Sequence, residues 1–276
     1  MSLLEIDDNL SIEYDVFGHG PPLLLIQGLG NQRSVWADMV DGLTEHFMVL
    51  TIELRGYAGC APAQSFTIAD LACDLLRCMD MLDIGGAHIF GHSQGGFIAL
   101  EMALASPERV FSLILGGSAS YTDEYGRHLL RHWRTILSEA GPARFNEALF
   151  LWNFSPYYFL EHPRQMRILQ KWVGRTKLDS KVYQQHNLAC ENYDTRDRLH
   201  CITMPTLLIG GSQDIIMGER HIQLLQELIP HARLAIIPKA GHQFFLENPE
   251  ETLSRVSAFL PVWGCDTGKD SNSGGN

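Results

Sequence analysis

Paired cysteines, an excess of basic charge and long apolar runs are all missing from this sequence of 276 residues. Its six cysteines, at positions 60, 73, 78, 190, 201 and 265, form no Cys-x-x-Cys pair. Scattered thiols of this kind are typical of a reducing compartment, and they predict neither a disulfide framework nor a zinc site. We therefore expect a cytoplasmic protein.

The charge balance disfavours two classes of partner. The formal net charge is −11 at pH 7, which argues against nucleic acid or an anionic membrane as the main partner. No apolar run approaches the roughly 18 residues of a membrane-spanning helix. Glu5, Asp7 and Asp8 stand where a secretion signal would be basic and then apolar. With 45% hydrophobic and 19% charged residues, the composition indicates a soluble globule with a large core.

Short apolar runs alternate with helical patterns along most of the chain. We predict strands at 11–17, 23–26, 47–52, from 87 to the turn at 93, 110–115, 206–209 and 233–237. We predict helices at 36–43, 67–82, between 93 and 107, at 219–228 and at 249–260. This order is typical of an α/β fold, in which helices cover both faces of a mostly parallel central sheet.

Residues 121–201 interrupt the alternation. Nothing in this stretch reads as a strand, and we predict helices at 125–138, 143–151, 163–173 and 178–191. An all-helical insertion of this kind predicts a cap over the ends of the strands. We expect the core to comprise residues 1–120 and 202–263, the cap residues 121–201, and a disordered, small and polar tail residues 264–276.

The stretch 87–100 carries the clearest functional motif. It reads as a buried strand, a tight turn centred on Ser93 and a helix that begins with small residues. Gly91 and Gly95 flank the serine as Gly-x-Ser-x-Gly, and residues of this size let strand and helix pass closely. The hydroxyl would then stand at the tip of the sheet, with the backbone N–H of Gln94 directed at an oxyanion formed there.

This motif resembles the nucleophile elbow of the α/β-hydrolase family, and the resemblance covers about residues 10–262. It includes Gly241-His242 followed by Glu247-Asn248-Pro249-Glu250, an ending typical of the family. Two supporting positions depart from the family's pattern, because Gln27 stands where histidine is frequent and Glu53 where aspartate is usual. These departures bear on the shape of the loops more than on the reaction.

The resemblance implies a catalytic triad in the chain order serine, acid, histidine. The acid should follow a late strand, and Asp214 comes shortly after the one at 206–209. The histidine should follow the next strand, and His242 comes after the one at 233–237. Ser93, Asp214 and His242 would act as nucleophile, orienting carboxylate and general base. Asp214 could instead only cap the helix that follows it.

The same resemblance assigns the second oxyanion donor to the backbone N–H of Leu29, in the glycine-rich loop after the strand at 23–26. His92 adjoins the nucleophile, but adjacent side chains diverge in such a turn, so we expect it to pack or hydrogen-bond inside the protein. The remaining histidines lack ligand spacing, and we therefore expect no metal and no organic cofactor.

Aromatic residues gather in the predicted cap. Each of them could simply hold the cap to the core. Together they predict an apolar pocket for a hydrophobic acyl group or ring system. The candidate pocket residues are Trp133, Trp152, Phe154, Tyr157 and Tyr158.

Acyl chemistry is the expected reaction. Related dehalogenases and epoxide hydrolases use an aspartate in place of Ser93, and related carbon–carbon bond hydrolases commonly carry tryptophan where Gln243 stands. The chain looks like small-molecule carboxylesterases and enol-lactonases. We therefore predict a monomeric or homodimeric serine hydrolase that cleaves a small hydrophobic carboxylic ester or lactone through an acyl-enzyme.

Two other functions stay open at this point. The first is a small-molecule receptor with a hydrolase fold, in which the triad binds a signal or cleaves it slowly. The second is a cofactor-free cyclase or lyase of a biosynthetic pathway that uses the same pocket without an acyl-enzyme.

Overall fold

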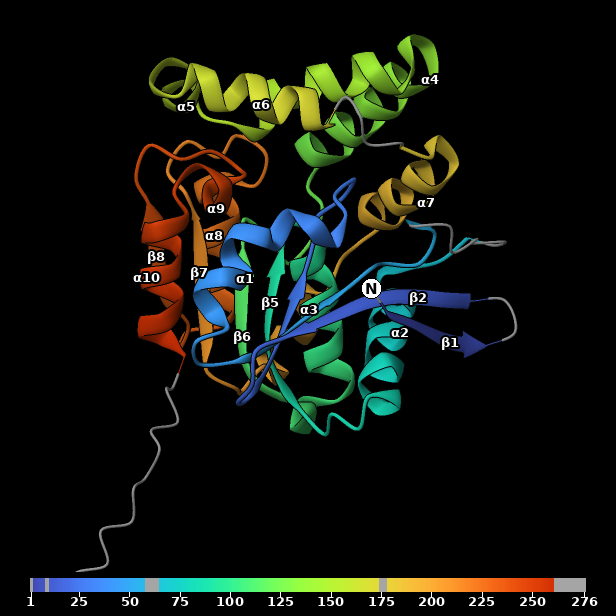
Figure 1. Cartoon of the computed structure of the whole chain (residues 1–276), viewed down its shortest axis with the longest axis vertical. Helices are drawn as coiled ribbons and strands as arrows, with labels where there is room; N and C mark the ends of the chain where they lie inside the picture. The colour runs from blue at the N-terminus through green and yellow to red at the C-terminus, as the bar shows by residue number, and fades with distance from the viewer. Residues whose placement is uncertain (1, 8–9, 58–64, 174–177, 261–276) are drawn as a thin grey trace, which may run out of the picture.

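The computed structural model describes residues 2–7, 10–57, 65–173 and 178–260. Over these ranges it shows one sheet in the order β1-β2-β4-β3-β5-β6-β7-β8 (Figure 1). Its strands are β1 (Ser2–Asp7), β2 (Leu10–Phe17), β3 (Pro22–Ile26), β4 (Met48–Ile52), β5 (Ala87–His92), β6 (Val110–Gly116), β7 (Thr206–Gly211) and β8 (Arg233–Ile237). The tail predicted at 264–276 lies outside the described residues.

The strands from β4 to β8 in this order pair in parallel, whereas the pairs β1–β2 and β2–β4 are antiparallel. The prediction of a mostly parallel sheet is confirmed. The edge strand β1 was not expected from the sequence. Leu4 is buried, but Leu3 beside it is 57% exposed, so the apolar signal is weak. Pairing with β2 forms this strand.

Strand β3 explains why the central runs are apolar throughout. Leu24 and Ile26 pack in a cluster with residues of α2 (Ile68–Met81), α3 (Gln94–Ala105) and α8 (Gly218–Leu228). Leu23 and Leu25 point the other way, into a cluster with α1 (Ala37–Leu43) and α10 (Pro249–Phe259). Burying a leucine side chain contributes about 2 kcal/mol. Helices therefore cover both faces of the sheet, as predicted.

Four helices between β6 and β7 lie over the carboxyl ends of the strands (Figure 1). They are α4 (Glu124–Asn153), α5 (Pro156–Glu161), α6 (Pro163–Val173) and α7 (Ser180–Glu191). The helices expected at 125–138 and 143–151 are one element, kinked where Gly141 has φ 79° before Pro142. The sequence reading missed α5, which the Ser155 side chain caps. The division into core and cap domains stays a prediction.

No helix in the part of the chain that the structure describes has the length and apolarity needed to cross a membrane.

The turn between β5 and α3 places Ser93 under backbone constraint. Ser93 has φ 56° and ψ −118°, a conformation that residues with a Cβ rarely adopt. A Cβ on Gly91 would lie 2.1 Å from the carbonyl oxygen of Gly95. A Cβ on Gly95 would lie 2.1 Å from that of Ile26 in β3. The two glycines are therefore a requirement of close backbone packing.

We expect Gly95→Ala to lower the free energy of unfolding by more than about 3 kcal/mol, beyond the usual range for an added methyl group. The added carbon would meet main chain on β3, which no side-chain rotation can relieve. Urea unfolding measures the effect. Gly85→Ala is the matched control, because a Cβ there has no atom within 4 Å. Equal losses in both variants would contradict the steric argument.

Candidate active site

Asp214 and His242 leave neighbouring strands and meet above the sheet. Asp214 follows β7, His242 follows β8, and the Nδ1–H of the imidazole donates to Asp214 Oδ2 at 2.8 Å. The other carboxylate oxygen accepts the backbone N–H groups of Ile216 and Met217 at 2.8 and 3.0 Å. Asp214 therefore caps the segment that follows it and also contacts His242. The two roles considered for it from the sequence, helix cap and partner of the histidine, are both present in the structure.

The environment of Asp214 favours its charged form. Burial raises the pKa of this carboxyl group, but the facing His242 and the hydrogen bonds from His242 and the backbone outweigh burial. The net pKa lies below the ordinary value, so the group is a carboxylate at neutral pH. A charged acceptor at this position holds the proton of His242 on Nδ1 and leaves Nε2 as the free acceptor.

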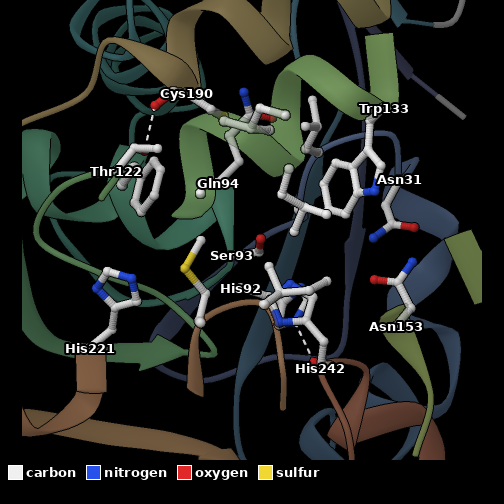
Figure 2. A pocket seen from close by; sticks show the side chains of 18 of the residues that line it. Asn31, His92, Ser93, Gln94, Thr122, Trp133, Asn153, Cys190, His221 and His242 are labelled. Atoms are coloured by element: carbon white, nitrogen blue, oxygen red, sulfur yellow. Dashed lines mark hydrogen bonds between the residues drawn. The ribbon is translucent and has the colours of Figure 1, made fainter. Parts of the chain in front are cut away.

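Ser93 and His242 line the same cavity (Figure 2). Ser93 is 8% exposed, its N–H donates to Gly116 at 2.8 Å, and its carbonyl oxygen accepts the Ser118 hydroxyl at 2.9 Å. Within the described residues there is no hydrogen bond between the Ser93 hydroxyl and His242. Such bonds are often long in a ligand-free enzyme and tighten with substrate. The complete triad stays a prediction.

The two predicted oxyanion donors lie on the wall of this cavity. Gln94 is the first residue of α3, where a backbone N–H has no acceptor within the helix. Leu29 lies in the loop after β3. That loop is held by the bond from the Asn31 N–H to Gly28 at 3.1 Å and from the Gly30 N–H to the Tyr57 hydroxyl at 3.2 Å. The direction of both donors toward an oxyanion stays a prediction.

His92 is fully buried, lines the same cavity as Ser93, and is bonded to the backbone of His242. Its Nε2–H donates to the carbonyl oxygen of His242 at 2.9 Å. Burial, with the neighbouring His242 adding to it, lowers the pKa of His92 to about 3, so the ring is neutral. The prediction that it hydrogen-bonds inside is confirmed. It supports the backbone of His242.

Helix α7 contacts the residue that follows the nucleophile. The side-chain amide of Gln94 donates toward His186 Nδ1 at 3.2 Å and the His186 carbonyl oxygen at 3.3 Å. The opposite ring nitrogen of His186 donates to the Arg55 carbonyl oxygen at 2.9 Å. Burial lowers the pKa of His186 to about 4, which keeps its Nδ1 an acceptor. No sequence pattern predicts this contact, because Gln94 and His186 are far apart in the chain.

A second tie joins the inserted helices to the histidine loop. Glu247 accepts the N–H and the hydroxyl of Ser155, at 3.2 and 2.5 Å, and the N–H of Gly241 at 2.8 Å. The Gln243 N–H donates to the carbonyl oxygen of Asn153 at 2.9 Å. Burial raises the pKa of Glu247 above its ordinary value, although these bonds oppose the rise. The start of α5 is thereby fixed against the residues on both sides of His242.

Gln27 and Glu53, the two departures from the family pattern, contact each other. The side-chain amide of Gln27 donates to Glu53 Oε1 at 2.8 Å, and the N–H of Arg33 donates to Oε2 at 3.2 Å. Burial raises the pKa of Glu53 to about 7, against the opposing effect of Arg33. A buried carboxyl group that titrates near neutrality therefore supports the loop that carries Leu29.

The cavity encloses an empty volume of about 700 Å³, open solvent at its mouth included. Trp133 lines it, as the sequence predicted. Phe154 lines a neighbouring cavity, and Trp152, Tyr157 and Tyr158 line neither. The sequence reading missed polar groups on the wall, namely Asn31, Thr122, Asp123, Asn153, His221 and Gln243.

The three predicted pocket residues that line neither cavity make other contacts. Tyr158 belongs to a separate apolar cluster with Phe150, and Tyr157 is exposed beneath the ammonium of Lys239. Trp152 packs at an angle against Trp133. Within the described residues no three His, Cys, Asp or Glu side chains are grouped as metal ligands.

Comparison with known proteins identifies the family of this chain. A model of the α/β-hydrolase fold matches residues 21–249. A protein of Azorhizobium caulinodans assigned as the carbamate hydrolase RutD is 28% identical over 243 residues, 86% of this chain and 90% of that protein. The pimeloyl-[acyl-carrier protein] methyl ester esterase of Aeromonas hydrophila is 26% identical over 266 residues, 91% of this chain and 100% of that protein.

Among solved structures, the enol-lactonase of Burkholderia xenovorans LB400 superimposes with a TM-score of 0.84. It covers 92% of this chain and 97% of its own, with 24% identity. At this identity the likeness shows the fold alone.

Because the pKa of Glu53 is raised, we expect the free energy of unfolding to decrease as pH rises from about 4.5 to about 7. Between these values the unfolded glutamate has lost its proton while the folded one retains it, so the folded state binds more protons. At about 1.4 kcal/mol per pH unit, the decrease is on the order of 3 kcal/mol.

Urea unfolding of the wild type and Glu53→Gln across this range measures the effect. The difference between the two free energies should change in favour of the variant as pH rises. Glu139→Gln, on an exposed part of α4, is the control for the loss of one surface carboxylate. Parallel pH profiles for Glu53→Gln and the wild type would contradict the assignment.

Proposed function

Because the chain belongs to the α/β-hydrolase fold family, we propose that it is a serine hydrolase that cleaves a small hydrophobic carboxylic ester or lactone through an acyl-enzyme. The observation that carries the proposal is the 2.8 Å bond between His242 and Asp214 beside the cavity that Ser93 lines. An oriented imidazole next to a serine on a strained turn is the arrangement that nucleophilic catalysis needs.

In the proposed reaction, His242 Nε2 takes the proton of the Ser93 hydroxyl as the oxygen attacks the carbonyl carbon. The N–H groups of Leu29 and Gln94 receive the oxyanion. When the tetrahedral intermediate collapses, the bond to the alcohol breaks and the alcohol leaves with the proton from His242. Water, activated by the same imidazole, then attacks the acyl-enzyme and releases the acid.

The walls of the cavity support an apolar acyl substrate. Phe97, Leu129, Leu130 and Trp133 line it together with the proposed catalytic groups. The relative from Aeromonas hydrophila is named for a methyl ester and the one from Azorhizobium caulinodans for a carbamate, and both of these groups contain a carbonyl carbon. These names support a hydrolase, and the apolar side chains on the wall favour a hydrophobic ester or lactone.

We expect a fluorophosphonate probe to modify Ser93, because the activated hydroxyl attacks phosphorus as it would a carbonyl. Mass mapping of the labelled peptide identifies the site. Labelling should be lost in Ser93→Ala and in His242→Ala, and retained in Ser254→Ala, an exposed serine on α10. Modification elsewhere, or none of the folded protein, would overturn the proposal.

Activity assays of the wild type and of Ser93→Ala distinguish the esterase from the two alternative functions. Rapid turnover of aryl esters that depends on Ser93 is expected for an esterase. A receptor would show one slow turnover together with a ligand-dependent partner. A cyclase or lyase without an acyl-enzyme would keep full activity in Ser93→Ala.

We expect Asp214→Asn to lower kcat for an aryl ester by about 10³–10⁴-fold without unfolding the protein. Asparagine keeps an oxygen for the N–H groups of Ile216 and Met217. Its amide nitrogen faces His242 Nδ1 in place of the carboxylate, which favours the wrong tautomer.

The matched control is Asp179→Asn, because Asp179 caps α7 through one oxygen in the same way and has no hydrogen bond to a histidine among the described residues. Steady-state kinetics and circular dichroism of both variants provide the comparison. An unchanged kcat in Asp214→Asn would show that this carboxylate serves the helix cap alone.

A further inference from the structure

A second cavity adjoins the catalytic cavity beneath the inserted helices. Its empty volume is about 760 Å³, open solvent included. We call it the outer chamber. The two cavities share part of their walls, and the residues that line both are Leu29, Asn31, Leu149, Asn153 and Gln243. A ligand that starts at Ser93 and extends past these residues enters the outer chamber.

The walls of the outer chamber are mostly apolar. Phe150 and Phe154 come from the end of α4 and its C-cap and stack with ring centroids 5.3 Å apart. Leu169 comes from α6, and Leu246 from α9 (Phe244–Glu247). An aliphatic chain gains about fourfold in binding for each methylene group buried against such walls, equivalent to about 0.8 kcal/mol.

The wall that the two cavities share carries polar groups beside Leu29 and Leu149. We call its Asn31, Asn153 and Gln243, together with Trp133 from the cavity that Ser93 lines, the polar neck. Figure 2 shows the amide ends of Asn31 and Asn153 turned toward one another, with the indole nitrogen of Trp133 on the same side. The four side chains carry hydrogen-bond donors and acceptors and no net charge.

Two atoms of the polar neck have unused hydrogen-bonding capacity. Trp133 is 6% exposed and Gln243 is 5% exposed, and within the described residues neither Nε1 of Trp133 nor Oε1 of Gln243 has a partner. Buried polar atoms without partners destabilise a protein, so such atoms on a cavity wall point to a ligand group that satisfies them. A donor and an acceptor on residues of one cavity wall match a neutral group that offers both, such as a secondary amide.

We propose that the polar neck and the outer chamber bind an apolar chain that an amide group joins to the reacting acyl group of the substrate. The amide lies between the side chains of the neck, and the chain extends between Phe150, Phe154 and Leu169. This site rests on the proposed function, because it orients the carbonyl carbon that Ser93 attacks. It also gives a role to Gln243, the residue directly after the proposed catalytic histidine.

The first test compares aryl esters of N-hexanoylglycine and nonanoic acid, whose acyl chains have equal length and differ by the amide. We compare the two esters by dividing kcat/KM for the amide ester by kcat/KM for the all-carbon ester. We expect Asn153→Leu, which keeps the size of the side chain, to lower this ratio by about fivefold. The all-carbon ester is the internal control. Asn31→Leu repeats the test should the first variant fold poorly. An unchanged ratio in a folded variant would overturn the role of the neck.

The second test fills the outer chamber. We expect Leu169→Trp to lower the ratio of kcat/KM, nonanoate ester over acetate ester, by at least tenfold. The matched control is Ile168→Trp on the same helix, because Ile168 is 67% exposed and lines neither cavity. The control should retain the wild-type ratio. Equal ratios in Leu169→Trp and the wild type, or a wild type indifferent to chain length, would overturn the chamber.

The outcomes separate this inference from the proposed function. When acetate ester is cleaved at Ser93 and both ratios are insensitive to the variants, the chain-binding site is wrong and the esterase function stands. When no ester is cleaved and no probe labels Ser93, both are wrong.

Discussion

The close approach of two backbones at Gly95 is the constraint on which the site depends. A Cβ at that position would lie 2.1 Å from the carbonyl oxygen of Ile26 at the end of β3. The first turn of α3 therefore lies directly against the loop that follows β3. This packing brings Leu29 and Gln94, the two proposed oxyanion donors, to the wall of one cavity. It also forces Ser93 to φ 56°, a conformation that costs of order 1–3 kcal/mol and that the surrounding core must offset.

The inserted helices are bonded to the residues of the candidate active site as well as lying over it. Gln94 is bonded to His186 of α7 on one side of the cavity. Glu247 and the backbone of Gln243 hold Ser155 and Asn153 on the other. Any displacement of α4 or α7 would therefore strain the backbone beside Ser93 or His242. The position of these helices and the position of the proposed catalytic groups are set by the same hydrogen bonds.

The family resemblance selected Ser93, Asp214 and His242, and the geometry of a parallel sheet explains why Asp214 bonds to His242 and why His242 lines one cavity with Ser93. Residues that follow parallel strands emerge at the same edge, so strand order and chain spacing limit where each side chain lies. The Gly-x-Ser-x-Gly pattern was equally informative, because a Cβ atom at either glycine would overlap a backbone carbonyl oxygen. Such local and periodic signals are visible in a single sequence.

The lining of the cavity could not be predicted in the same way. Trp133 lines the cavity that Ser93 also lines, whereas Tyr157 is exposed, although both lie in helices rich in aromatic residues. Which face of an inserted helix turns inward depends on how the helices dock, and the kink at Gly141 changes that orientation partway along α4. Contacts such as Gln94 with His186 or Glu247 with Ser155 join residues about 90 positions apart, and no pattern within either segment reveals them.

The two departures from the family pattern show how a single sequence can mislead when positions are judged one at a time. Gln27 and Glu53 each weaken the resemblance, but in the structure they form one contact of 2.8 Å. Glutamate is one methylene longer than aspartate, and its carboxyl group also accepts the N–H of Arg33. Replacing either residue alone by its usual family counterpart would alter the bonds of a buried carboxyl group, which is costly. The pair is therefore one structural solution for holding the loop that carries Leu29, and it should be substituted as a unit.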